Sequence, residues 1–131
     1  MHSEHFSVKE LECPTSKEIK LADGFIDQLE TLRTIFNSPM SVQSGCRSNA
    51  HNKWLLSRSY PASMDSFHLI ENVKYGCDTC AVDIAWPKIG DRHRFMDIAT
   101  SSGWSIGIAK TFIHIDRRID YTDLKPAFYQ Y

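Results

Sequence analysis

The clearest pattern in the chain is a helical repeat of hydrophobic residues in its N-terminal third. Between residues 23 and 37, apolar side chains recur at spacings of three and four, which places them on one face of a helix. They are Phe25, Ile26, Leu29, Leu32, Ile35 and Phe36. The pattern predicts an amphipathic helix over residues 23–37 that ends at Asn37-Ser38-Pro39.

Other segments alternate with the period of a strand or repeat the helical spacing. Strands are predicted over residues 40–44 and 81–86, and two runs at 104–109 and 111–116 predict an antiparallel hairpin or a bent strand. A second helix is predicted over residues 91–101, with Gly103 as its stop. Residues 7–12 read as a polar entry segment, and residues 48–71 as a long loop around a short helix. The order of elements indicates an α+β fold, a small antiparallel sheet with flanking helices.

Composition and charge narrow the class of protein. A chain of 131 residues fits one domain, and 42% hydrophobic with 24% charged residues is typical of a globular protein. Fifteen Lys and Arg against sixteen Asp and Glu, without a basic block, argue against nucleic acid as a partner. No apolar stretch is long enough for a signal peptide or a membrane span. We therefore expect a protein made in the cytoplasm that does not insert into a membrane.

The four cysteines do not suggest a disulfide framework in a chain without a secretion signal. Cys13 and Cys46 are isolated, whereas Cys77 and Cys80 form a C-x-x-C motif. Free thiols are the leading interpretation. A redox role for the motif, or a zinc site formed by all four cysteines, remains an alternative.

The run Phe112-Ile113-His114-Ile115-Asp116 predicts a strand with one apolar face, called the dry face below, and one face of ionisable side chains. Strand alternation places His114 and Asp116 on one face and the two isoleucines on the other. An imidazole is a common zinc ligand, and a carboxylate two residues away can orient it or accept a proton from metal-activated water. An isolated H-x-D on a solvated strand face is the alternative.

Asp83 lies between Ala81 and Ala85 on the same predicted strand face, which leaves room for a bulky group. A carboxylate enclosed there without a cation would be poorly satisfied. A metal site and a plain edge position in contact with water are both compatible with this pattern.

These segments, taken in order, resemble the zinc D-alanyl-D-alanine carboxypeptidases, a group that includes VanY-like enzymes and phage L-alanyl-D-glutamate endolysins and shares the hedgehog-type fold. The matching blocks are His5-Phe6-Ser7, Glu10-Leu11-Glu12-Cys13, Leu29-Glu30-Thr31-Leu32-Arg33, Val42-Gln43-Ser44-Gly45-Cys46-Arg47-Ser48, His51-Asn52, Ser66-Phe67-His68, Ala81-Val82-Asp83-Ile84, Gly103-Trp104-Ser105-Ile106-Gly107-Ile108 and Phe112-Ile113-His114-Ile115-Asp116. The resemblance implies one zinc ion held by His68, Asp83 and His114, with a water or substrate in the fourth position.

The chain departs from the family pattern in two places. His68 and Asp83 are fifteen positions apart instead of the family's shorter spacing, so residues 69–80 must form an insertion that loops out. An ungapped match would put Gly76 at the position of the histidine ligand, and glycine has no side chain to bind zinc. The family's carboxylate three residues before the last histidine corresponds to Thr111, which cannot act as a base.

Three further residues are candidates for roles in the site. Asp116 is assigned the proton transfer, with orientation of His114 as the alternative. In the resemblance Arg47 is expected to bind a substrate carboxylate, with a surface salt bridge as the alternative. Trp104 is a core or cleft-wall residue and is the tryptophan expected nearest the metal.

The resulting hypothesis is a zinc peptidase that cleaves peptidoglycan stem peptides, acts on the cell wall as a phage lysis or virion component, and is a monomer. Two rivals remain. One is a catalytically inactive zinc-binding module of the virion or the wall. The other is a protein whose function depends on the C-x-x-C motif.

Overall fold

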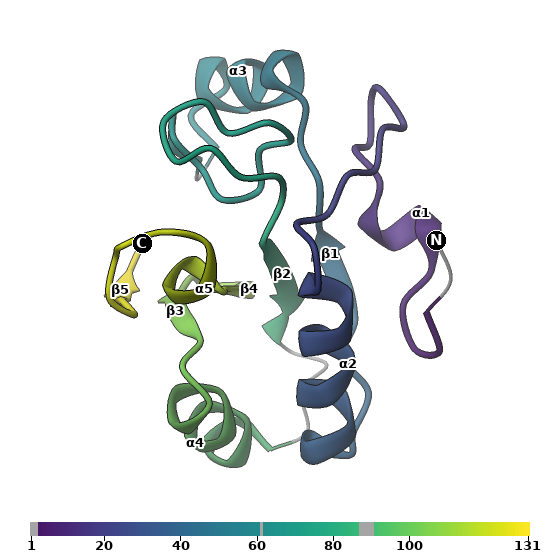
Figure 1. Ribbon diagram of the computed structural model, residues 1–131, viewed down its shortest axis with the longest axis vertical. Helices are drawn as coiled ribbons and strands as arrows, with labels where there is room; N and C mark the ends of the chain where they lie inside the picture. The colour runs from purple at the N-terminus through teal and green to yellow at the C-terminus, as the bar shows by residue number, and fades with distance from the viewer. Residues whose placement is uncertain (1–2, 61, 87–90) are drawn as a thin grey trace.

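The computed structural model describes residues 3–60, 62–86 and 91–131, which form one mixed sheet with helices around it (Figure 1). Its elements in chain order are α1 (Val8–Leu11), α2 (Phe25–Phe36), β1 (Val42–Ser44), α3 (Asn49–Ser57), β2 (Ala81–Ala85), α4 (Arg92–Ser101), β3 (Ser105–Ile108), β4 (Phe112–Asp116), α5 (Arg118–Tyr121) and β5 (Phe128–Gln130). The strand order is β1-β2-β4-β3-β5.

The first four strands pair antiparallel, as predicted. The fifth, β5, pairs parallel with β3 and had no counterpart in the prediction, which ended at residue 116. The predicted α+β class is confirmed, and β5 adds a parallel edge to the antiparallel sheet. Among the described residues, no helix is long and apolar enough to cross a membrane.

One face of the sheet packs against α2 and α4, which lie side by side in the lower half of Figure 1. The isoleucine and valine side chains of β2, β3 and β4 on this face are buried, including the predicted dry face of Ile113 and Ile115: Val82, Ile84, Ile106, Ile113 and Ile115. They meet the apolar stripe of α2, and the rings of Phe36 and Phe95 join the two helices edge to face at 5.2 Å. Hydrophobic periodicity was therefore sufficient to predict both helices and this core.

The N-terminal segment forms a short helix, α1, where the sequence analysis expected only a polar entry segment. Ser7 accepts a hydrogen bond from the backbone N–H of Glu10, and the Glu10 side chain accepts one from the Ser7 backbone. This capping box satisfies the free groups at the start of the helix, and Leu11 is buried. Four residues are too few for a hydrophobic repeat to be recognised.

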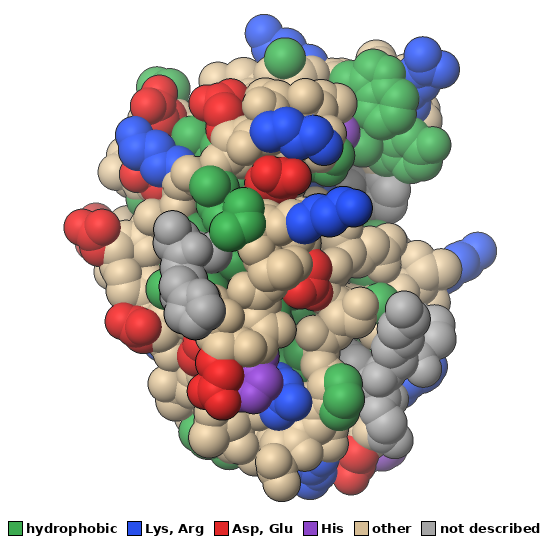
Figure 2. Space-filling view, turned by 90° about the vertical axis from the view of Figure 1, so that its right-hand side faces the viewer, with side chains coloured by type: hydrophobic (Ala, Val, Ile, Leu, Met, Phe, Trp, Pro, Cys, Tyr) green, Lys and Arg blue, Asp and Glu red, His purple; other side chains and the backbone are tan. Residues whose placement is uncertain are grey.

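Figure 2 shows one face of the molecule on which acidic and basic side chains are interspersed. The described residues of this face form no extended basic region. The expectation that nucleic acid is not a partner stays a prediction.

Candidate metal centre

The face of the sheet opposite the helices carries polar side chains from neighbouring strands. Asp83 on β2 is paired with His114 on β4, and Ala81 is paired with Asp116. Partners on adjacent strands point their side chains to the same face. The sheet register therefore brings Asp83 and His114 together as direct neighbours.

His68 reaches this face from the loop between α3 and β2 rather than from a strand. Its neighbours are fixed by backbone hydrogen bonds on both sides, from Arg47 N to His68 O at 2.8 Å and from Cys80 N to Phe67 O at 3.0 Å. Thr79 Oγ1 also donates to His68 O at 2.9 Å. Cys80 is therefore hydrogen-bonded beside Phe67, and the segment between them loops out, as the sequence analysis predicted.

The tip of this insertion is a tight turn. Asn72 N donates to Cys77 O at 2.8 Å, and Gly76 adopts a positive φ of 67° in the turn between them. A Cβ atom on Gly76 would have no neighbour within 4 Å. Gly76 therefore serves a turn, and the histidine of this region is His68.

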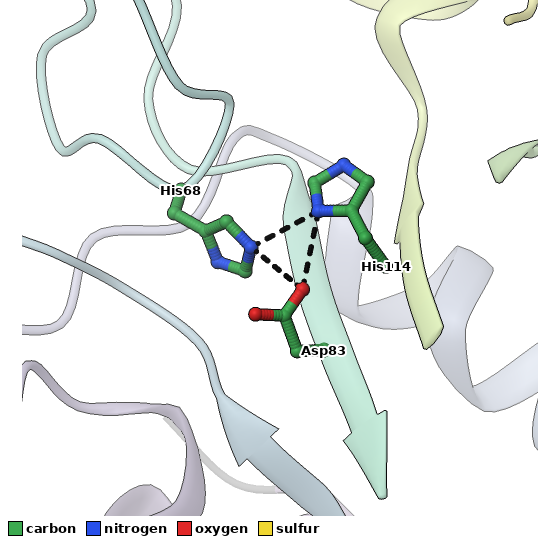
Figure 3. Close-up of side chains that lie close together, drawn as sticks. All are labelled: His68, Asp83 and His114. Carbon is green, nitrogen blue, oxygen red and sulfur yellow. Dashed lines mark hydrogen bonds and ion pairs between the residues drawn. The ribbon is translucent and has the colours of Figure 1, made fainter. Parts of the chain in front are cut away.

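Three side-chain atoms converge at the base of the insertion (Figure 3). His68 Nε2 lies 3.0 Å from Asp83 Oδ1 and 3.1 Å from His114 Nδ1, and Asp83 Oδ1 lies 3.1 Å from His114 Nδ1. All three residues are at most 4% exposed. No other group of potential metal ligands this close was found among the described residues.

The remaining ring nitrogens of both histidines are already engaged. His68 Nδ1 lies 2.7 Å from Gly45 O, and since a carbonyl oxygen can only accept, that nitrogen carries a proton. His114 Nε2 lies 2.7 Å from Asp116 Oδ2 and donates to this carboxylate. In the neutral tautomers, both inward nitrogens present lone pairs, beside a carboxylate oxygen.

Three buried acceptor atoms within 3.1 Å of one another require a cation between them. Two imidazoles and one carboxylate match a catalytic zinc site, and a tetrahedron with zinc–ligand distances of 2.0–2.1 Å has edges of about 3.3 Å. The observed triangle is close to one face of that tetrahedron. The residues present therefore fit a zinc ion.

The electrostatics of the metal-free cluster reflect the same crowding. Burial by itself opposes ionisation of Asp83, but the two histidines hold its pKa well below the usual range. Burial and the Arg47 charge lower the pKa of His68. At His114 burial acts against protonation, yet hydrogen bonds to Asp116 and Asp83 raise its pKa to about 9. Without a metal, a proton on His114 supplies the cation.

Asp116 lies behind His114 and is completely buried. Oδ1 accepts from the backbone N–H and Nε of Arg118 at 2.9 and 3.0 Å, while Oδ2 accepts from Arg118 Nη2 at 2.8 Å and from His114. Burial would raise its pKa, but these donors keep it well below the usual range. Such contacts favour the second role considered for Asp116, orientation of His114.

Arg47 is 5% exposed and is committed to the site itself. Its Nη2 donates to Asp83 Oδ2 at 3.2 Å, and Nε donates to Ser44 Oγ at 3.3 Å. Nη1 donates to Asn52 Oδ1 at 3.5 Å, at the edge of hydrogen-bonding distance. Arg47 therefore aligns the free oxygen of Asp83 and also lines the adjoining cleft.

The structure does not bring Trp104 to the cleft where the sequence analysis expected it. Trp104 is 3% exposed and packs edge to face on Phe25 at 5.9 Å, with the Arg117 guanidinium on its ring at 5.1 Å. Ser105 and Gly107, paired with Asp116 and His114, face the metal cluster. Alternation therefore directs Trp104 and Ile106 to the helix-covered face.

A cleft of about 480 Å³ adjoins the histidines. Its walls include three residues that the sequence analysis missed: Arg118, Tyr129 and Tyr131. Arg118 continues the alternation of His114 and Asp116, and Tyr129 and Tyr131 flank a polar residue as in a short strand. Extending the alternating pattern beyond residue 116 would have marked all three.

A family model described as Peptidase M15 matches residues 4–116. The chain belongs to the Peptidase M15 family. Searches of curated proteins and of solved structures gave no significant match.

Membership of the M15 family confirms the resemblance found in the sequence, because this family of zinc peptidases includes the VanY-like D-Ala-D-Ala carboxypeptidases. It indicates a zinc-dependent metallopeptidase that acts on peptidoglycan. The match does not specify individual ligands. The assignment of His68, Asp83 and His114 rests on the geometry of the cluster.

Proposed function

We propose that this M15 protein hydrolyses a peptide bond in peptidoglycan stem peptides and uses one zinc ion. The bond is of the D-Ala-D-Ala carboxypeptidase or the L-alanyl-D-glutamate endopeptidase type. The observation that carries the proposal is the convergence of three buried acceptor atoms beside an open cleft. Such a site leaves a fourth position free, as catalytic zinc chemistry requires.

His68, Asp83 and His114 would hold the metal. A zinc ion bound there supplies Lewis acidity, which polarises a carbonyl group and lowers the pKa of a bound water. Hydrogen bonds within the protein orient the two histidine ligands. Gly45 O and the Asp116 carboxylate fix which ring nitrogen of each histidine faces inward.

Arg47 supports two parts of this function. Its guanidinium orients Asp83, and its positive charge borders the cleft into which a carboxylate-bearing stem peptide would enter. We propose that Arg47 attracts the substrate and stabilises the metal ligand at once. The near-complete burial of Arg47 supports its role in orienting Asp83 more strongly than direct bidentate binding of a substrate carboxylate.

A catalytically inactive zinc-binding module is the second candidate, and the positions of the carboxylates favour it. Both oxygens of Asp116 are occupied, and the family's carboxylate position holds Thr111. Asp65 is the only carboxylate among the described cleft-lining residues outside the zinc cluster, and it lies 3.4 Å from Lys74 Nζ. Metal binding without turnover is the outcome that this candidate predicts.

The test is metal analysis of the purified protein together with mass spectrometry of muropeptides before and after digestion. We expect about one zinc per chain, cleavage of stem peptides, and loss of cleavage in EDTA that added zinc restores. His68→Ala should lose both zinc and cleavage, whereas His93→Ala, exposed on α4, should keep both. Zinc without cleavage would identify the inactive module, and absence of both would refute the proposal.

A further inference from the structure

The C-terminal strand β5 lies in register with the metal cluster. Asp83 pairs with His114, His114 with Gly107, and Gly107 with Tyr129, so these residues form one row across β2, β4, β3 and β5. Neighbours in such a row point to the same face. Tyr129 therefore projects to the face that carries the metal ligands. The M15 match ends at residue 116, so it assigns nothing to this strand.

Gly107 allows the ring of Tyr129 to lie across the sheet toward His114. A Cβ atom at Gly107 would lie 2.5 Å from Tyr129 Cε2 and 2.6 Å from its Cζ, closer than real contacts allow. The ring centroids of Tyr129 and His114 are 6.1 Å apart. The absence of a side chain at position 107 is therefore what places an aromatic ring beside the metal ligand.

Tyr131 extends this aromatic surface along the same face. Its backbone N–H donates to Ile108 O at 2.9 Å, which continues the pairing with β3. Its ring lies 5.6 Å from that of Tyr129, edge to face, and 5.4 Å from that of Phe112. Tyr131 is 52% exposed, and both tyrosines line the cleft with the two histidines.

Two residues that the sequence analysis placed at the site are engaged within the protein. Trp104 lies in the core, and Asp116 is saturated by His114 and Arg118. A tyrosine offers an apolar ring face and a hydroxyl donor, with few rotatable bonds to immobilise. Two tyrosines in the wall of a zinc peptidase cleft are therefore suited to hold a peptide backbone.

We propose that Tyr129 and Tyr131 form the substrate-positioning wall of the cleft. Their ring faces pack on the bound peptide, and their hydroxyl groups donate hydrogen bonds to its carbonyl oxygens. This inference rests on the proposed function, because it takes the stem peptide as the ligand. It adds a binding element from a part of the chain that lies outside the family match.

The test uses the full chain and a synthetic stem pentapeptide, L-Ala-γ-D-Glu-L-Lys-D-Ala-D-Ala. Binding to the metal-free protein is measured by calorimetry, and KM and kcat are measured with zinc. Replacing Tyr129 or Tyr131 by Phe should weaken binding about 3- to 10-fold, the loss of one hydrogen bond. The Ala variants should weaken it about 10- to 100-fold. KM should rise more than kcat falls.

Phe128→Ala is the matched control, since Phe128 lies on the same strand, is 62% exposed and does not line this cleft. It should leave peptide affinity unchanged, and all variants should bind zinc like the wild type. Unchanged affinity and KM in both tyrosine-to-alanine variants, with the fold and zinc binding intact, would overturn the proposal.

Failure of the proposed function gives a different result. If the wild type neither binds nor cleaves the peptide, both the proposed function and the proposed role of Tyr129 and Tyr131 are refuted. If the wild type binds but does not cleave, the calorimetric comparison still decides whether the tyrosines hold the peptide.

Discussion

His114 Nε2 lies 2.7 Å from Asp116 Oδ2, on the opposite side of the ring from the nitrogen that faces Asp83 and His68. This carboxylate fixes the tautomer that leaves Nδ1 free to bind a metal. This contact and those from Arg118 occupy both oxygens of Asp116, which favours the orienting role over that of proton acceptor. The two roles considered for Asp116 therefore predict different experimental results.

Asp116→Asn should weaken zinc binding about 10- to 100-fold, as expected for loss of the group that orients a ligand. A general base would instead leave zinc affinity unchanged and abolish turnover at saturating zinc. A zinc competition titration and kcat at saturating zinc separate the two. Asp120 lies on α5, and Asp120→Asn, which removes an ion pair with Arg117, serves as the control and should affect neither. Full zinc affinity in Asp116→Asn would contradict the orienting role.

Zinc binding should release a proton at neutral pH. The pKa of His114 is raised to about 9 in the metal-free protein, so at pH 7.5 most molecules carry a proton there that zinc must displace. The apparent zinc affinity should therefore increase as the pH rises toward 9 and then level off. Calorimetry in buffers of different ionisation enthalpy measures the released proton. Release of no proton at pH 7.5 would contradict the raised pKa.

The metal-free protein should lose stability over the same alkaline range. The folded pKa of His114, about 9, exceeds the ordinary value of 6.5. Its contribution is therefore complete below about pH 6.5 and is lost as the pH rises through about 9. Thermal unfolding in EDTA between pH 6.5 and 9.5 should show a decline that is smaller in His114→Gln. Parallel pH profiles of the two proteins would count against this assignment.

Gly107→Ala should displace the ring of Tyr129 and lower stability by about 1–3 kcal/mol through overpacking. In a Tyr129→Ala background the same change should cost much less, because the clashing ring is gone. Chemical denaturation of the four proteins of this cycle gives the coupling energy. An equal cost in both backgrounds would show that Gly107 is required for another reason.

Trp104→Phe should lower stability by about 1–3 kcal/mol, because it shrinks a buried side chain and removes packing against Phe25 and Arg117. KM for the stem peptide should not change, since Trp104 lies on the helix-covered side of the sheet. Trp54→Phe, on the exposed side of α3, is the control and should alter stability by about 0.5 kcal/mol or less. A raised KM with unchanged stability would restore Trp104 to the cleft.

Replacing Cys77 and Cys80 together, by Ser and Ala respectively, should leave zinc content and turnover unchanged. All four cysteines are free thiols, and none belongs to the group of converging ligands among the described residues. Burial raises the pKa of both thiols, which disfavours the reactive thiolate. Loss of zinc in this double variant would revive the C-x-x-C motif as a metal site.

Much of the fold was accessible from local sequence patterns. The three- and four-residue spacing of α2 and the alternation in β2 and β4 reflect which side chains share a face, and backbone geometry determines this within a few residues. Asp83 and His114 could be placed on polar strand faces for that reason. The short α1 and β5 were missed, because three or four residues carry too little periodicity.

The sequence by itself thus determined α2, α4, the first four sheet strands and the polar face that bears Asp83, His114 and Asp116. Only the tertiary structure decided which of these groups meet. Backbone pairing with Arg47 brings His68 to the site. The sheet register places Trp104 in the core. Tyr129 approaches His114 because Gly107 has no side chain. Each is a contact between segments distant in the chain, and such contacts form through strand order and packing, which local periodicity does not encode.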